Sequence, residues 1–265
     1  MSLLVTTFGG QEEFERGKAI LEERGFAHDV LSAEPGFRLV ATPALVVDED
    51  VRRELSRGGA NAFLCAGWVD YTPPQVPVPA GEPPVFPDGL FRRAAISVLA
   101  PCVADVNRIR IIAQVEGDIA PVMPYLNAVM DRASYNPRAA VLTFMDAYRM
   151  VALHSHRITV AKADEIVDAW RALEEIRTRV EAVWAGRNEI EPSYETRERP
   201  PALEIFKRLP RTNCKACGEP SCLAFAVRVW SGEVSVNDCH PVFDDAGENV
   251  HLREALEEVC AALGV

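Results

Sequence analysis

The sequence predicts a mixed α/β protein in which two small α/β units precede a small helical unit that carries four cysteines. Three observations lead to this prediction. Short apolar runs alternate with amphipathic stretches through the first 190 residues. A proline-rich stretch interrupts that pattern, and a cysteine-rich segment follows it. We therefore expect a small α/β domain at 1–67, a proline-rich linker at 68–91, a second α/β domain at 92–190 and a cysteine-rich domain at 191–265.

The first unit begins with the pattern of a strand followed by a helix. Residues 3–8, LLVTTF, form a short apolar run of the β type. Residues 11–24 place apolar side chains among charges, and Gly25 stands where a helix commonly ends. Residues 37–47 predict one or two further strands, and Asp48 can cap a short helix after them. Such an alternation predicts a small α/β unit, and residues 1–67 also resemble a small family of ferredoxin-like domains, which implies a ferredoxin-like or related α/β fold.

The linker is defined by its proline content, because residues 71–90 hold seven of the 19 prolines. Proline fixes φ and removes a backbone donor, so this segment is expected to be an extended connector that lies over the surface. The second α/β unit follows, and its helices are predicted at 118–133 and 164–187. Its strands are predicted at 108–115, 139–145, 149–155 and 157–163. In the longer helix an apolar stripe repeats at three- and four-residue spacing. The stripe consists of Ile166, Trp170, Leu173, Ile176, Val180 and Val183.

Composition restricts the class of protein. Hydrophobic residues make up 48% and charged residues 25%, which is the composition of an ordinary globular protein. No apolar run reaches the roughly 20 residues of a membrane span, and the first residues lack the pattern of a signal peptide. We therefore expect a cytoplasmic protein, in which clustered thiols are more often metal ligands than disulfides. The net charge of −11 argues against nucleic acid as a partner.

The cysteine spacing is the most informative motif in the chain. Three cysteines lie within nine residues, and a fourth follows after 16 more. The four are Cys214, Cys217, Cys222 and Cys239. Three thiolates on one tight loop can bind three corners of a compact cluster, and a distant fourth thiolate can complete the ligand set. This pattern favours a cysteine-ligated iron–sulfur cluster.

The residues between these cysteines suit the same purpose. Gly218 permits a turn with positive φ, and Ser221 can cap a helix that starts at Cys222. The helix N-terminus favours anionic groups such as thiolates. One face of the helix is expected to shield the site. That face consists of Leu223, Ala226, Val227 and Trp230.

Two alternatives remain open at this point, namely a structural zinc ion and a set of redox-active thiols. Structural zinc usually takes two separated C-x2-C pairs, and the second pair is missing here. Cys65, Cys102 and Cys260 are isolated in the sequence and are expected to be buried apolar side chains. A site formed by Cys65 with Cys102 also stays open. We find no catalytic triad, phosphate loop or dinucleotide fingerprint, so no catalytic residue is assigned.

The segment LPRTNCKACGEPSCLAFAVRVWSGEVSVNDC resembles the four-cysteine 4Fe–4S domain in the large subunit of corrinoid iron–sulfur proteins. It also resembles the B subunit of Rnf-type electron-transfer complexes. The resemblance covers about residues 203–242, and His240 stands where a proline is expected. It implies one 4Fe–4S cluster with Cys214, Cys217, Cys222 and Cys239 as its ligands. No corrinoid is expected, because the chain lacks room for the barrel and the cobalamin-binding part.

The function expected from this cluster is electron transfer to or from a metalloenzyme partner, by a protein that is not itself an enzyme. The alternatives are an accessory factor that assembles or reactivates a complex metallocentre, and a structural or sensory cluster protein. Five cations lie near the cysteine loop, with Glu219 as the main opposing charge. They can stabilise the reduced cluster, form a docking rim for an acidic partner, or be ordinary surface charges. The five are Lys207, Arg208, Arg211, Lys215 and Arg228.

Overall fold

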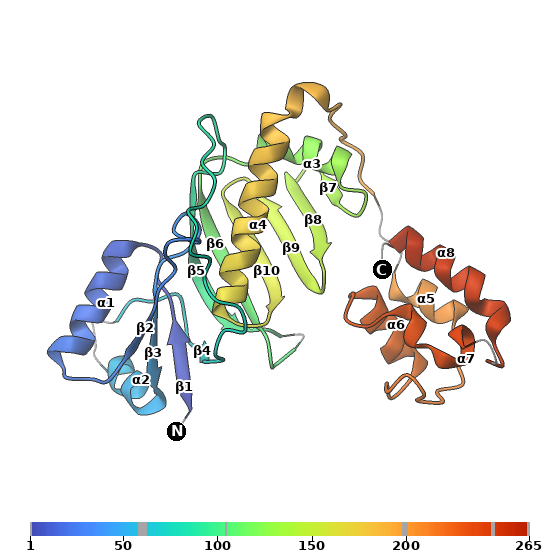
Figure 1. The fold of residues 1–265 in the computed structure, drawn as a ribbon, viewed down its shortest axis with the longest axis horizontal. Coiled ribbons are helices and arrows are strands. Elements are labelled where there is room, and N and C mark those ends of the chain that lie inside the picture. The colour runs from blue at the N-terminus through green and yellow to red at the C-terminus, as the bar shows by residue number, and fades with distance from the viewer. Residues whose placement is uncertain (1, 58–62, 104, 198–200, 245–246, 264–265) are drawn as a thin grey trace.

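The structure, a computed structural model, describes residues 2–57, 63–103, 105–197, 201–244 and 247–263 (Figure 1). Its strands are β1 (Leu3–Thr6), β2 (Asp29–Leu31), β3 (Ala44–Asp48), β4 (Val69–Asp70), β5 (Arg93–Pro101), β6 (Ile109–Glu116), β7 (Ser134–Asn136), β8 (Val141–Asp146), β9 (Arg149–His154) and β10 (Arg157–Ala163). Its helices are α1 (Gln11–Glu23), α2 (Glu49–Ser56), α3 (Met123–Val129), α4 (Ile166–Ala185), α5 (Ala202–Arg208), α6 (Cys222–Trp230), α7 (His240–Phe243) and α8 (Arg253–Leu263). The predicted α/β class is confirmed. None of the helices in the described residues combines the length and hydropathy that a transmembrane segment requires.

The first sheet has the strand order β2-β3-β1-β4, and its neighbouring strands are antiparallel. Val5 of β1 lies opposite Val46 of β3. Successive residues of a strand point to opposite faces, so β3 contributes to two apolar layers. Leu45 and Val47 pack with residues of α1 and α2, whereas Ala44 and Val46 join the core of the second sheet. The first sheet is therefore covered on both faces.

The second sheet has the order β5-β6-β10-β9-β8-β7, again with antiparallel neighbours. Buried and more exposed residues alternate along β6, as expected for a strand with one face toward a core. The long helix α4 crosses one face of this sheet (Figure 1). Glu165 caps it by accepting hydrogen bonds from the N–H groups of Val167 and Asp168. Five residues of the predicted stripe are buried, and Val183 is partly buried. The five are Ile166, Trp170, Leu173, Ile176 and Val180.

The two sheets share one continuous hydrophobic core, to which Val5 and Phe37 of the first unit contribute. The backbone also links the two units, because the N–H of Leu99 donates to the carbonyl of Ala66 at 2.7 Å. Residues 71–90 of the proline-rich linker lie against this body without forming a helix or a strand, whereas the start of the predicted linker forms β4. The Arg177 guanidinium donates to the carbonyl of Pro84 at 2.8 Å and fixes part of the connector against α4.

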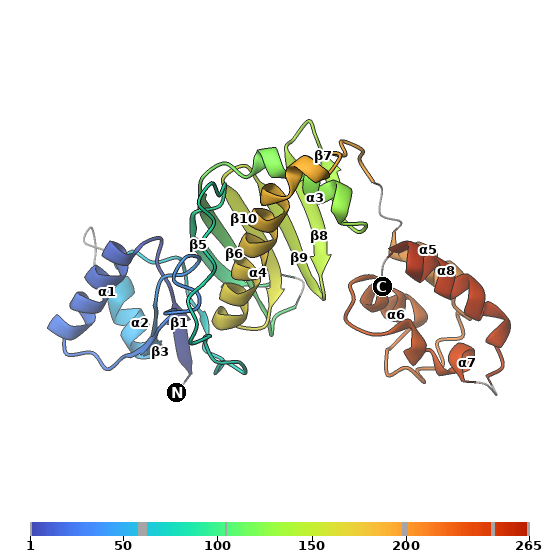
Figure 2. The same ribbon diagram turned by 45° about the horizontal axis from the view of Figure 1, so that its top comes forward.

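Helices α5 to α8 form a separate helical unit with a core of its own. Figures 1 and 2 show this unit beside the second sheet, on the side where β8 and β9 lie. Its core includes Ile205, Leu209, Phe225, Ala226, Val229, Val236, Val242, Leu256 and Val259. This core does not merge with the cores of the two sheets in the described residues.

The segment that leads toward the helical unit is bound to the body as far as Arg197. The buried side-chain amide of Asn127 donates to the carbonyls of Ser193 and Glu195 at 3.1 and 2.9 Å. The Arg197 guanidinium donates to the carbonyls of Asn127 and Met130 at 2.6 and 2.8 Å. We propose that the folded body extends to Arg197 and not only to residue 190.

Several elements differ from the prediction. The strands β2, β4, β5 and β7 and the helices α5 and α7 were not predicted. Residues 37–40 were predicted as strand but form hydrogen-bonded turns, from which the side chains of Phe37 and Val40 enter the core. The helix predicted at 118–133 begins with a 3-10 turn at Ala120–Val122 and is α-helical only in α3, because it contains two prolines.

Separate folding of the body can be tested with two truncations made without iron. A chain of residues 1–197 is expected to unfold cooperatively and to be about 1–3 kcal/mol more stable than a chain of residues 1–190. The shorter chain lacks Ser193 and Glu195, so the buried amide of Asn127 loses its hydrogen-bond acceptors, which lowers the free energy of unfolding. Urea denaturation followed by circular dichroism measures both. An unfolded 1–197 chain beside a folded full chain would show that the helical unit belongs to a common core.

Candidate metal centre

The four sequence-predicted cysteines are brought together in the helical unit, where they line one small cavity. They come from three segments of chain. Cys214 and Cys217 lie on the loop between α5 and α6, Cys222 is the first residue of α6, and Cys239 precedes α7. Cys214 is exposed, Cys217 and Cys222 are half-buried, and Cys239 is buried. The cavity is therefore closed on the side of Cys239 and open on the side of Cys214.

The loop that carries the first two cysteines has an unusual backbone. Arg211, Asn213 and Lys215 have φ values of 59°, 52° and 63°, and Gly218 has a φ of 83°. The left-handed region is unfavourable for residues that have a Cβ, with a cost of the order of 1–3 kcal/mol each, and such residues gather at functional sites. The prediction that Gly218 adopts positive φ is confirmed. Three strained non-glycine residues in five positions indicate a loop shaped for a ligand.

The same loop is joined to the start of α6 by a side chain. The N–H of Cys222 donates to Oδ1 of Asn213 at 2.8 Å. Ser221 caps the helix, as predicted, by accepting a hydrogen bond from the N–H of Ala224 at 3.1 Å. Asn213 is suited to this position because asparagine tolerates the left-handed conformation better than most residues. The role of Asn213 was not predicted from the sequence, in which the adjacent cysteine was the signal that pointed to it.

Cys239 is positioned by the backbone on either side of it. It follows a 3-10 turn at Val236–Asp238 that begins with a capping box between Ser235 and Asp238. The carbonyl of Cys239 accepts hydrogen bonds from the N–H groups of Val242 and Phe243 at 2.8 and 3.0 Å. Because neighbouring apolar side chains are buried in the core of the helical unit, packing of that unit places the fourth thiol.

The thiols interact electrostatically. Burial, followed by the thiols of Cys217, Cys222 and Cys214, raises the pKa of Cys239 to about 11. The pKa of Cys260 is also raised to about 11, but by burial alone. Cys260 thus lies in the same core without belonging to the group of four. No three His, Cys, Asp or Glu side chains in the described residues are gathered as for a single metal ion. A 4Fe–4S cluster has a different requirement, since each thiolate binds a different iron.

The predicted shielding face of α6 is wrong in part. Leu223 and Val227 are 48% and 47% exposed, and the buried face consists of Phe225, Ala226 and Val229. Of the predicted face, Ala226 is buried and Trp230 is partly buried, so the prediction is wrong only for Leu223 and Val227. All residues of α6 except Cys222 and Arg228 are apolar or aromatic, so the pattern did not define one buried face.

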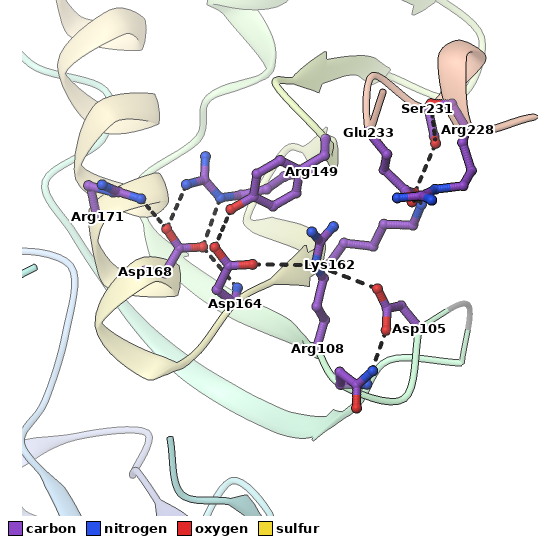
Figure 3. A network of polar contacts seen from close by, with 12 residues as sticks. Asp105, Arg108, Arg149, Lys162, Asp164, Asp168, Arg171, Arg228, Ser231 and Glu233 are labelled. Carbon is purple, nitrogen blue, oxygen red and sulfur yellow. Dashed lines mark hydrogen bonds and ion pairs between the residues drawn. The ribbon is translucent and has the colours of Figure 1, made fainter. Parts of the chain in front are cut away.

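A chain of ionic contacts runs from the cysteine loop to the second sheet. Arg228 of α6 contacts Glu219 of the loop, and its Nε lies 3.2 Å from Oε2 of Glu233. Glu233 also contacts Lys162 of β10 and accepts a hydrogen bond from Ser231 at 2.9 Å. Figure 3 shows the part of this chain from Arg228 to Lys162. Burial opposes the charge on Arg228, but its hydrogen bonds to Glu219 and Glu233 outweigh burial and raise the pKa of the guanidinium.

The backbone has positive φ on both sides of the contact between Lys162 and Glu233. Lys162 has a φ of 67° and interrupts the pairing of β10 with β6 between Ala161 and Ala163. A β-bulge of this kind re-aims a side chain. Across the boundary, Gly232 has a φ of 72°, and a Cβ there would lie 2.9 Å from the carbonyl oxygen of Ala147. The backbones of the helical unit and the sheet are therefore so close at Gly232 that there is no room for a side chain.

The sheet side of the boundary continues as a buried polar network (Figure 3). Arg149 makes a bidentate contact with Asp168 at 2.6 and 2.9 Å. The Nε of Arg108 lies 3.3 Å from Oδ1 of Asp164, whose N–H donates to Asp168. Such a network holds the strand ends near Lys162 in one arrangement.

Comparison with known proteins agrees with this site. Residues 209–241 match the family model described as "Putative Fe-S cluster". This segment is an iron–sulfur domain. The family match covers all four cysteines that line the cavity. A comparison with solved structures gave no significant match.

The relatives of the iron–sulfur domain are subunits of larger proteins or complexes. The chain is 48% identical over 59 residues to the corrinoid/iron-sulfur protein large subunit of Moorella thermoacetica. It is 39% identical over 57 residues to the acetyl-CoA decarbonylase/synthase complex subunit gamma of Archaeoglobus fulgidus. Each match covers 22% of this chain and 12% of the relative. The chain therefore spans about an eighth of the length of the relatives it matches, and the likeness concerns the iron–sulfur domain.

The other two cysteines lie elsewhere. Cys65 packs against the core between the first sheet and its helices. Cys102 is buried just after β5, where its N–H donates to the carbonyl of Arg108 at 2.8 Å.

Cys239 and Cys260 provide a matched pair of substitutions. Both thiols are buried in the core of the iron–sulfur domain, but only Cys239 lines the cavity. Cys239→Ala is expected to leave about three iron atoms per chain and a 3Fe-type paramagnetic signal, because three ligands remain on the loop and on α6. Cys260→Ala is expected to keep the full iron content. Iron analysis and electron paramagnetic resonance measure both, and equal loss in the two variants would contradict the assignment.

The contact between Glu233 and Lys162 predicts a pH dependence of stability. Burial alone would raise the pKa of Glu233, but hydrogen bonds from Lys162, Ser231 and Arg228 outweigh it and lower the pKa below the ordinary 4.5. The unfolded chain therefore takes up this proton first as pH falls. The stabilisation is complete above about pH 4.5 and is lost as pH falls through the lower pKa of the folded state.

This dependence is measured by urea denaturation of the iron-free full chain at pH 7 and pH 4. Glu233→Gln is expected to cost about 1–3 kcal/mol at pH 7 and less at pH 4. Glu257→Gln, at an exposed position of α8, serves as the control and is expected to change neither value. The same cost for Glu233→Gln at both pH values would show that its charge is unimportant.

Proposed function

We propose that the iron–sulfur domain holds one 4Fe–4S cluster and that the protein passes single electrons to or from a metalloenzyme partner. The proposed ligands are Cys214, Cys217, Cys222 and Cys239. One observation carries the proposal, namely that four thiols from three segments of chain line one cavity within a segment that matches an iron–sulfur family. The strained backbone of the loop supports it, since binding of a ligand is needed to offset such strain.

The cluster supplies reversible one-electron chemistry when it is bound. The residues of the chain set the conditions for it. Cys239, Phe225 and Leu209 exclude water from the inner side, because all three are buried. The positive end of the α6 dipole favours negative charge next to Cys222. The exposed side at Cys214 provides the shortest route between the cavity and a partner protein.

A second proposal is that the protein is an accessory factor, because the exposed side at Cys214 also suits delivery of a cluster. An accessory factor that delivers a cluster to a metallocentre under assembly also needs an accessible cluster edge. The relatives named above include a subunit of an acetyl-CoA decarbonylase/synthase complex, which agrees with a role beside a metalloenzyme. Transfer of iron and sulfide to an iron-free acceptor protein would favour this proposal over electron transfer.

The test of the main proposal is the metal content and redox behaviour of the anaerobically purified protein. We expect about four iron and four sulfide per chain, and a cluster that is reduced and reoxidised by one electron without loss of iron. Controlled-potential titration followed by electron paramagnetic resonance measures this. One zinc per chain without sulfide would exclude the cluster. Reduction that releases the iron would favour a structural or sensory role.

A further inference from the structure

Most of the cations near the cysteine loop are neutralised within the iron–sulfur domain. Lys207 and Arg208 both contact Glu204, at 2.6 and 3.1 Å. Arg228 is held by the ionic chain described above. Glu204 offsets one of the two charges of Lys207 and Arg208, and the charge of Arg228 is fully offset by Glu219 and Glu233.

Two cations of the loop differ from the rest. Arg211 and Lys215 are exposed, as is every residue of 211–216. In the described part of the chain, neither side chain has a carboxylate within 4.0 Å. They stand on either side of Cys214, the exposed member of the four thiols. The two unneutralised charges therefore flank the open side of the cavity.

We propose that residues 211–216 form a docking face for an acidic surface of the redox partner protein. This inference rests on the function proposed above, because it names the side from which the electron passes. Apart from this face, a chain of net charge −11 repels an acidic protein at long range. Local cations at Cys214 would then orient the partner, since complementary charge gives specificity and rate more than affinity.

The shape of the loop supports docking over a role in stabilising the reduced cluster. Exposed charges are screened by water and salt, so Arg211 and Lys215 act weakly on a charge inside the cavity. A partner that covers the loop removes this screening and strengthens the contact with its own carboxylates. The left-handed backbone at both residues fixes the loop that carries the two charges.

Zero-length cross-linking tests the proposal without using the redox activity. The sequence contains only four lysines, at 18, 162, 207 and 215. The first three contact Glu22, Glu233 and Glu204 respectively. Carbodiimide joins a lysine to a carboxylate, and an acidic flavodoxin is the probe for the full chain with its cluster. We expect the intermolecular cross-link at Lys215 in the mass spectrum. A cross-link only at another lysine, or none, would overturn the proposal.

Oxidation rates provide the second arm. One electron passes from the reduced cluster to ferricyanide, an anion, or to hexaammineruthenium(III), a cation. In R211Q/K215Q, at low salt, the rate with ferricyanide is expected to fall about fivefold and the rate with the ruthenium complex to rise. The control K207Q/R208Q removes the same charge from the same domain and is expected to change both rates by less than about twofold.

Equal effects of the two double variants, or no change in R211Q/K215Q, would overturn the docking face. Rates are normalised to iron content, so loss of cluster is not mistaken for loss of docking. A cluster that cannot be reduced reversibly would overturn the proposed function instead. In that case the cross-link still decides whether an acidic protein docks at Lys215.

Discussion

Cys239 has to reach thiols that lie 16 or more residues earlier in the chain, and it does so only because the helical unit packs around its own core. Closing a longer loop adds only about 0.6 kcal/mol for each doubling of its length, so separation alone is a small obstacle. The larger obstacle is that the backbone at Cys239 has to point its thiol toward the other three. The capping box before Cys239 and the hydrogen bonds to its carbonyl fix the backbone there, and the buried valines on both sides anchor it.

Some charged residues of the cysteine loop form ion pairs within the protein, and others remain exposed on its surface. Glu219 of the cysteine loop contacts Arg228, which also contacts Glu233, and Glu233 in turn contacts Lys162 on the sheet. The side of the loop at Cys214 keeps its positive charge. One side of the iron–sulfur domain is therefore tied to the body, and the other is free to meet another protein. Both arrangements use neighbouring residues of one short loop.

Local patterns in the sequence predicted the parts of this protein that depend on local physics. The stripe of α4, the cap at Ser221 and the turn at Gly218 follow from spacing and residue type, and the structure confirms them. Two features could not be predicted this way. The bulge at Lys162 has meaning only when Glu233 lies opposite, and their contact joins residues 71 positions apart. The buried side of α6 depends on which helices cover it, since its apolar residues surround the axis.

The small size of the iron–sulfur domain favours additional stabilisation from a bound cluster and from the body. A helical unit of about 60 residues has too small a core to supply more than about 3–5 kcal/mol by packing alone. Metal binding contributes folding free energy directly, and a charged contact with a neighbouring domain adds to it. The three strained residues of the cysteine loop make the demand greater. A bound cluster and the contact at Lys162 would each add to the stability that packing supplies. The domain would then be most stable when it is loaded and held against the body, which is the state in which a partner has to recognise Cys214.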